Sequence, residues 1–292
     1  KLYVAQPSLS QQIARLEQEL GVPLLVRSSQ GVKPTGAGQA MYRHARLVLR
    51  QMEQLRQDVK EGVGAEAGTV AVGFPTTMVS MLAMSLFGRV RERYPGIRLQ
   101  FFESMSGYIS ELLANGRLDL AILFRDSNTT GVTAMPLLDE ELYLLGEPEG
   151  GLPGRARTCA LAQLSGVPMV APGVSNGLRI LLERVFTREN LELNIVADID
   201  SLPTLVSIAQ SGAACVILPA SAAALGQGGS RVMARRIVEP GISRPASLCW
   251  PNALPVDSAA LAVRRTIVEL VSELSLDGSW PGITLRNVGA MG

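Results

Sequence analysis

The chain has 292 residues, of which 47% are hydrophobic and 18% are charged, and its net charge at pH 7 is +1. This composition supplies enough apolar side chains for two or three domains and excludes an intrinsically disordered chain. Uninterrupted apolar runs stay below the ~18 residues that a membrane helix needs. Three cysteines, odd in number and widely spaced, are typical of a reducing cytoplasm, and we expect Cys159, Cys215 and Cys249 to be structural.

The positive charge is concentrated at the start of the chain. Residues 1–62 hold nine Lys or Arg against five Asp or Glu, whereas the remainder holds 18 against 21. This asymmetry favours attraction of phosphate groups by one end of the molecule and solubility of the other.

Residues 6–21 predict a helix with two different faces. Large apolar side chains recur at spacings of four, three and four, and so share one helical stripe: Leu9, Ile13, Leu16 and Leu20. Pro7 suits a first helical turn, Ser8 and Gln11 fit a capping box, and Gly21 supplies a left-handed stop. The other face carries Ser, Gln and Arg, which the major groove of DNA can accept, although a solvated surface helix has the same pattern.

A two-stranded wing is predicted next. Residues 24–27 have the pattern of a short strand, residues 28–31 that of a turn, and residues 32–35 that of a return strand that Pro34 confines to a sheet edge. Thr35 can then cap the helix that follows.

That next helix carries apolar side chains at coiled-coil spacing. We call these residues the heptad seam: Met41, Ala45, Val48, Met52, Leu55 and Val59. Arginines and a lysine flank the seam, so the simplest partner for it is a second copy of the chain. Packing of the helix on its own domain is the alternative.

Beyond a glycine-rich hinge at residues 62–68, strands alternate with helices. Residues 69–102 read as strand, helix and strand, and a comparable order returns over residues 168–199. Such units favour parallel sheets with right-handed crossovers, so two similar α/β lobes are predicted.

Several motifs together resemble the family of LysR-type transcriptional regulators. Ala5–Glu17, Leu24–Arg27 and Lys33–Gly38 are similar to the family's DNA-binding domain, and the segments that begin at Gly116 and Gly212 are similar to its effector-domain signatures. The sequences of the first domain and of residues 142–146 most resemble the nitrogen assimilation control branch of this family.

The resemblance implies an α/β fold class with an N-terminal winged helix-turn-helix, a long linker helix and a two-lobed effector domain like that of periplasmic binding proteins. It predicts a chain that crosses between the lobes near Gly146 and returns near Trp250. The implied divisions are a DNA-binding domain at 1–40, a dimerisation helix at 41–62, lobe I at 69–146 and 250–276, lobe II at 147–249, and a flexible tail at 277–292.

Two departures from the family pattern are expected to matter. The sequence opens at Lys1 without a methionine, at a point that the family reaches only late in its second helix, so we expect a truncated DNA-binding domain. Gln30 stands where the family's wing commonly carries an arginine.

The resemblance and groove chemistry together give candidate DNA contacts. Gln suits adenine and Arg suits guanine or phosphate. The helix residues expected at the groove and backbone are Gln6, Pro7, Ser8, Ser10, Gln11 and Arg15, and those expected at phosphate are Arg27, Lys33 and Thr35.

Candidate effector contacts lie where loops leave strands and enter helices, because free amides at helix N-termini attract polar groups. The expected residues are Pro75, Thr76, Thr77, Ser104, Ser106, Phe124, Gly173, Ser175, Asn176, Ser201 and Thr204. Arg179 would add a charge. For each residue, ordinary helix capping is the alternative.

An enzyme is not expected. The single histidine, His44, lies among the arginines of the heptad helix, and neither metal-ligand spacing nor a phosphate-binding loop occurs, so no cofactor is predicted. Asp119 is expected to be structural.

The sequence therefore predicts a cytoplasmic LysR-type regulator that binds promoter double-stranded DNA and responds to a small-molecule effector. It would act as a homodimer or tetramer through residues 41–62, with RNA polymerase as a further partner and no membrane. A solute-binding receptor and an effector-independent regulator remain the alternatives.

Overall fold

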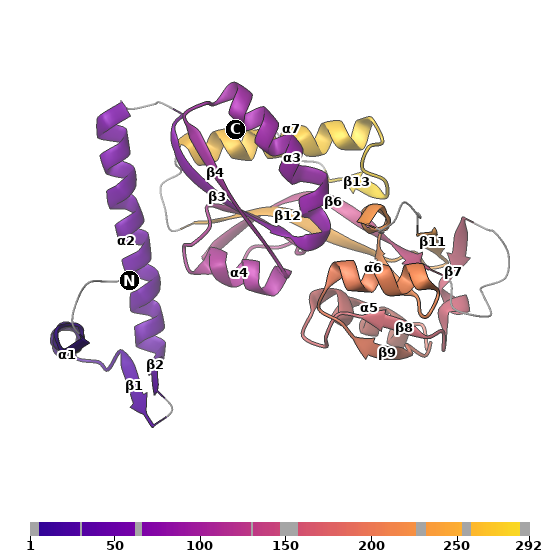
Figure 1. Ribbon diagram of the computed structural model, residues 1–292, viewed down its shortest axis with the longest axis horizontal. Coiled ribbons are helices and arrows are strands. Elements are labelled where there is room, and N and C mark those ends of the chain that lie inside the picture. Colours follow the sequence, from indigo (N-terminus) through magenta and orange to yellow (C-terminus); the bar gives the residue numbers. More distant parts are fainter. Residues whose placement is uncertain are drawn as a thin grey trace.

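The computed structural model describes residues 6–29, 31–61, 66–129, 131–146, 157–225, 232–252 and 258–286. A long helix stands beside a two-lobed α/β body and carries a short helix and a β-hairpin at its far end (Figure 1). Among the described residues, no helix is both long and apolar enough to cross a membrane.

The N-terminal head, defined as residues 6–38, consists of one helix, a hairpin and the start of the long helix. Its elements are α1 (Gln6–Leu20), β1 (Leu25–Ser28), β2 (Gly31–Pro34) and the first turn of α2 (Gly36–Glu61). The two strands are antiparallel, with Leu25 opposite Pro34, and Gly21 ends α1 with a φ of 68°. The predicted helix and wing are both present in the structure.

Thr35 and Gly38 join the wing to α2. The hydroxyl of Thr35 donates a hydrogen bond to the carbonyl of Pro23 at 2.7 Å and accepts one from the backbone N–H of Gly38 at 2.9 Å. A β-carbon on Gly38 would lie 2.0 Å from the carbonyl oxygen of Leu24. The predicted cap is therefore formed, and it brings two backbones so close that only glycine fits.

Gly38→Ala should loosen the head. The added methyl group must push the Leu24 backbone away, and such overpacking costs about 1–3 kcal/mol. We expect faster amide hydrogen exchange in β1, β2 and the first turn of α2. Gly36→Ala is the matched control, because nothing lies within 4 Å of its β-carbon position; equal exchange rates in the two variants would contradict the assignment.

Lobe I is built on three parallel strands that three helices cover. These elements are β3 (Gly68–Pro75), β4 (Ile97–Ser104), β5 (Leu120–Leu123), α3 (Thr76–Arg93), α4 (Ser106–Ala114) and α7 (Ser258–Leu276). Asp119 ties the lobe together, since its carboxylate accepts a hydrogen bond from the N–H of Ala71 at 2.7 Å and its own N–H donates to the carbonyl of Ala71. Its predicted structural role is confirmed.

Lobe II has its own buried core and a smaller parallel pair of strands. Its helices and strands are β7 (Thr158–Ala160), β8 (Met169–Ala171), α5 (Gly177–Arg188), β9 (Ile195–Asp198), α6 (Leu202–Ser211), β10 (Val216–Pro219) and β11 (Ala234–Val238), with short 3-10 helices at Leu161–Leu164 and Ala220–Leu225. All three cysteines are buried and free of disulfides, as a structural role requires.

Two long antiparallel strands connect the lobes: β6 (Val132–Leu145) and β12 (Ser243–Pro251). The beginning of β6 pairs with β12, and its end pairs with β10 and β11 of lobe II. The predicted return of the chain near Trp250 is too late by several residues. Residues 247–249 already pair with β5 of lobe I, and Ala246 already packs in the core of that lobe, so the chain has returned by Ala246.

The predicted flexible tail at 277–292 is wrong for its described part, residues 277–286. Strand β13 (Ile283–Leu285) pairs with β6, and Trp280 is only 2% exposed. Arg286 forms two hydrogen bonds with the carboxylate of Asp139, at 2.7 and 2.8 Å. Apolar burial and this ion pair outweigh the glycines on which the prediction rested; residues 287–292 lie outside the described residues.

Candidate functional site

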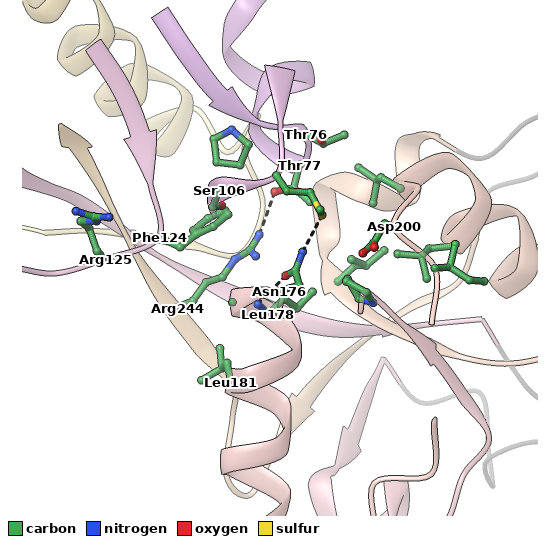
Figure 2. A pocket seen from close by; sticks show the side chains of 18 of the residues that line it. Thr76, Thr77, Ser106, Phe124, Arg125, Asn176, Leu178, Leu181, Asp200 and Arg244 are labelled. Carbon is green, nitrogen blue, oxygen red and sulfur yellow. Dashed lines mark hydrogen bonds between the residues drawn. The ribbon is translucent and has the colours of Figure 1, made fainter. Parts of the chain in front are cut away.

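A cavity of about 510 Å³ lies between the two lobes. Ends of strands and beginnings of helices from both lobes surround it (Figure 2), the position where α/β folds commonly hold ligands. Its lining consists of Pro75, Thr76, Thr77, Met105, Ser106, Phe124, Arg125, Asp126, Pro172, Asn176, Gly177, Leu178, Leu181, Arg184, Ile199, Asp200, Ser201, Leu202, Leu205, Leu218, Arg244 and Pro245.

Most residues expected at an effector site line this cavity. Those that do are Pro75, Thr76, Thr77, Ser106, Phe124, Asn176 and Ser201. The prediction needs correction for Ser104, Gly173, Ser175 and Thr204, and for the charge expected from Arg179, because none of these lines it.

The structure gives physical reasons for most of these corrections. The N–H of Gly173 donates to the Asp200 carboxylate at 3.0 Å, and the Thr204 hydroxyl donates to that of Ser201 at 2.9 Å. Arg179 forms ion pairs with Glu183 and Asp198, neither of which lines the cavity. Gly173, Thr204 and Arg179 therefore already have local hydrogen-bond partners, which spacing along the sequence does not reveal.

Four helices begin at the cavity, and only one has a side-chain cap. Asn176 caps α5, since its Oδ1 accepts a hydrogen bond from the N–H of Leu178 at 2.9 Å. Pro75, Met105 and Ser201 precede α3, α4 and α6 without a capping side chain. Capping therefore accounts for Asn176 and not for Ser201, and three helix N-termini face the cavity without one.

Arg244 is the most constrained polar residue of the lining, and sequence reasoning did not find it. It sits on β12, where that strand passes between the lobes, and is 6% exposed. Its Nε and Nη2 donate to Oε2 of Glu140 at 2.9 and 2.7 Å, and Nη2 also donates to the Thr77 hydroxyl at 3.0 Å. Its guanidinium lies 3.4 Å from the centre of the Phe124 ring (Figure 2).

Burial dominates the electrostatics of this pair. It raises the pKa of Glu140, while the charge and hydrogen bonds of Arg244 act in the opposite direction. Burial likewise lowers the pKa of Arg244, and Glu140 opposes that shift. The available sequence signal was Arg244 in one largely apolar strand and the acidic run at residues 139–141 in another, but that signal does not say which of these residues meet.

One hydrogen bond of the described residues joins the two lobes across the cavity mouth. Nδ2 of Asn176 in lobe II donates to Sδ of Met105 in lobe I at 3.3 Å. A neutral amide and a thioether form a weak bond, so this contact can open at little cost.

The N-terminal head presents its polar face to solvent. No residue of α1 is buried, and Gln6, Pro7, Gln11 and Arg15 are exposed, as are Arg27 and Lys33 on the wing. Ser8 and Ser10 are half-buried. The expectation that Thr35 meets phosphate needs correction, because its hydroxyl proton is given to the carbonyl of Pro23 and its N–H to that of Leu24; Gln30 lies outside the described residues.

Glu17 connects α1 to the wing. Its Oε1 accepts hydrogen bonds from the backbone N–H groups of Leu24 and Leu25 at 2.6 and 3.0 Å. These bonds lower the pKa of Glu17, and the charge of Arg27 adds to the effect. The first carboxylate of α1 is thus turned toward the wing amides.

Acidification should release the wing from α1. A depressed pKa means that Glu17 contributes stability above its ordinary pKa of 4.5 and loses that contribution as pH falls through the lower folded value. We expect the protection factors of the Leu24 and Leu25 amides to fall over that range. Glu17→Gln should remove this pH dependence, whereas Glu19→Gln, on the same helix, should retain it; unchanged protection in the parent protein at low pH would contradict the role.

No metal centre is evident in the part of the chain that the structure describes, since no three His, Cys, Asp or Glu side chains gather there in a way that could hold an ion.

A basic winged helix, joined by a long helix to two lobes around a cavity, defines the class of ligand-responsive DNA-binding regulators. Residues 1–39 match the family described as "Bacterial regulatory helix-turn-helix protein, lysR family", and residues 63–272 match the "LysR substrate binding domain". The chain belongs to the LysR family of transcriptional regulators. The family resemblance and the expectation of a regulator rather than an enzyme are confirmed.

Individual relatives agree with this placement. The chain is 34% identical to the nitrogen assimilation regulatory protein Nac of Escherichia coli (strain K12), over 93% of this chain and 88% of that protein. Its fold is similar to full-length OxyR from Pseudomonas aeruginosa, with a TM-score of 0.73 and 22% identity over 98% of this chain and 90% of that one. The fold is also similar to full-length CbnR, whose structure was solved with its target DNA. The TM-score is 0.59, and the two sequences are 22% identical over 92% of this chain and 91% of that one.

Proposed function

We propose that the chain binds promoter double-stranded DNA with α1 in the major groove and the wing on the phosphate backbone. The observation that carries this is the exposed Gln and Arg face of α1, whose first carboxylate, Glu17, is held by the wing amides. The proposed contacts are Gln6, Pro7, Ser8, Ser10, Gln11, Arg15, Arg27 and Lys33.

Base and phosphate contacts should respond differently to substitution. Gln11→Ala should cost about 1–3 kcal/mol at one base position and relax the preference there, since a bidentate amide contact is lost. Lys33→Ala should weaken binding to all sequences alike and reduce the salt slope by about one unit. Fluorescence anisotropy on operator and scrambled duplexes at several salt concentrations measures both, and equal losses on the two duplexes for Gln11→Ala would exclude base reading.

We propose further that two copies pair through α2. Four of the six residues of the heptad seam are exposed on this helix: Val48, Met52, Leu55 and Val59 are 52–78% exposed. Such a stripe of apolar side chains is costly in water, and a second copy of the same helix buries it most simply. The result would be a homodimer, with a tetramer as the higher assembly, that presents two heads to the two halves of an operator.

Met52→Ser combined with Leu55→Ser should convert the dimer to monomers. Each large apolar side chain contributes about 1.5–3 kcal/mol when buried, and the pair of helices loses four of them. Analytical ultracentrifugation of the whole chain measures the change. His44→Ser combined with Arg46→Ser is the control, because both residues are exposed off the seam; a seam variant with the parent's mass would refute this mode of pairing.

The cavity would act as the sensor in this proposal. A small molecule that binds one arrangement of the lobes better than the other shifts their populations, and the paired heads can pass that shift to the bend of the promoter. An effector-independent regulator is the alternative, and calorimetry that finds no ligand for the cavity would favour it. A solute-binding receptor leaves the head at residues 6–38 without a purpose.

We place the protein in the cytoplasm, where the DNA is, and its three free cysteines fit that compartment. In this proposal, RNA polymerase is a further partner once the promoter is bound. The proposed domain boundaries are those predicted from the sequence, with two changes. The chain returns to lobe I earlier, within β12, and lobe I extends to include β13.

A further inference from the structure

We propose that the cavity takes a small organic carboxylate with an apolar body, and that Arg244 is the residue that selects the carboxylate. This inference rests on the proposed function only in treating the cavity as the effector site.

The walls of the cavity suit an apolar body. Phe124 of lobe I, Leu178 and Leu181 of α5, and Leu202 and Leu205 of α6 all line it. A cavity of about 510 Å³ with such walls can enclose a ring or a short hydrocarbon chain and remove its apolar surface from water.

Arg244 offers one free edge of a fixed guanidinium. Nε and Nη2 are used by Glu140 and Thr77, and the ring of Phe124 covers one face. Nη1 makes no hydrogen bond with the described residues. Among those residues, it also does not belong to the side-chain atoms that are fully buried and lack a hydrogen-bond partner. Because Arg244 lines the cavity, its Nη1 protons are donors open to a ligand there.

Uncapped helix N-termini surround the same space. Thr76 and Leu202 begin helices with no side-chain cap, so the first-turn N–H groups remain available as donors, except at Pro203, which has none. These N–H groups and Nη1 of Arg244 are all hydrogen-bond donors that point in fixed directions. The lining offers no buried acceptor to pair with them. An acceptor-rich ligand group satisfies them best.

Charge balance favours a carboxylate over a phosphate or a cation. Glu140 neutralises Arg244, and the other lining charges, Arg125 and Arg184 against Asp126 and Asp200, balance in number, so the site offers donors without the excess positive charge that a dianion needs. The lining carboxylates, Asp126 and Asp200, are exposed, and Asp200 already accepts from the N–H of Gly173. A buried cation would therefore find no free carboxylate deep in the cavity.

The decisive comparison is between an acid and its amide. We suggest calorimetric titration of the whole chain with sodium benzoate, cyclohexanecarboxylate and hexanoate, each paired with its primary amide. The amides match the acids in shape and lack the charge, so each acid should bind about tenfold to a hundredfold more tightly, the range expected for hydrogen bonds to a charged group. Equal affinities for acid and amide, or no binding by any of the acids, would overturn the proposal.

Removing both members of the buried pair tests Arg244 itself. Arg244→Met combined with Glu140→Met leaves no uncompensated buried charge, so the lobes should still fold, as circular dichroism will check. The variant should lose the preference for acids over amides and keep the affinity for the amides. Thr77→Val removes one of the groups that hold the Arg244 guanidinium in a single orientation, so it should reduce the preference for acids over amides without unfolding the chain.

The matched control is Arg188→Met, because Arg188 lies on α5 outside the cavity and pairs with Glu189. It should leave all affinities unchanged. An unchanged acid preference in the double variant would reject Arg244 as the selecting residue. Operator binding by the same preparations, measured separately, distinguishes failure of this inference from failure of the proposed regulatory function.

Discussion

The antiparallel pairing of β6 with β12 is the constraint on which the rest of the structure depends. These two strands are the segments that belong to both lobes, and β5, β10, β11 and β13 attach to them or to their ends. Because the pairing runs from Val132 to Glu141, with one register shift, the lobes are joined by a sheet rather than by flexible loops. The cavity lies where this shared sheet meets the helix N-termini of both lobes.

The buried pair of Arg244 and Glu140 sits in that shared sheet and gives the cavity its chemistry. Two charges that leave water gain little net stability from each other, so such a pair is weak evidence of a stabilising role. What it does provide is a guanidinium held in one orientation by a carboxylate, a hydroxyl and an aromatic ring. The same residue touches lobe I at Thr77 and Phe124, which links whatever binds in the cavity to the relation between the lobes.

The head and the long helix follow a different physical logic. Their side chains are mostly exposed, and Leu24 is the one buried large apolar residue in the described part of this region. Short-range contacts organise it: Glu17 with the wing amides, Thr35 with Gly38, and Gly38 against Leu24. Such a unit holds its shape with little core, and its remaining apolar surface on α2 is available for a second copy.

The sequence by itself determined the elements whose signals are local. Periodicity gave α1, the wing, α2 and the repeated strand–helix order of the two lobes, and motifs gave the family. The tertiary structure alone decided which loops reach the cavity, where β12 returns to lobe I, that Trp280 and β13 dock on β6, and that Arg244 meets Glu140. The physical reason is distance along the chain: Arg244 and Glu140 are 104 residues apart, and pairing over that separation leaves no pattern in either segment.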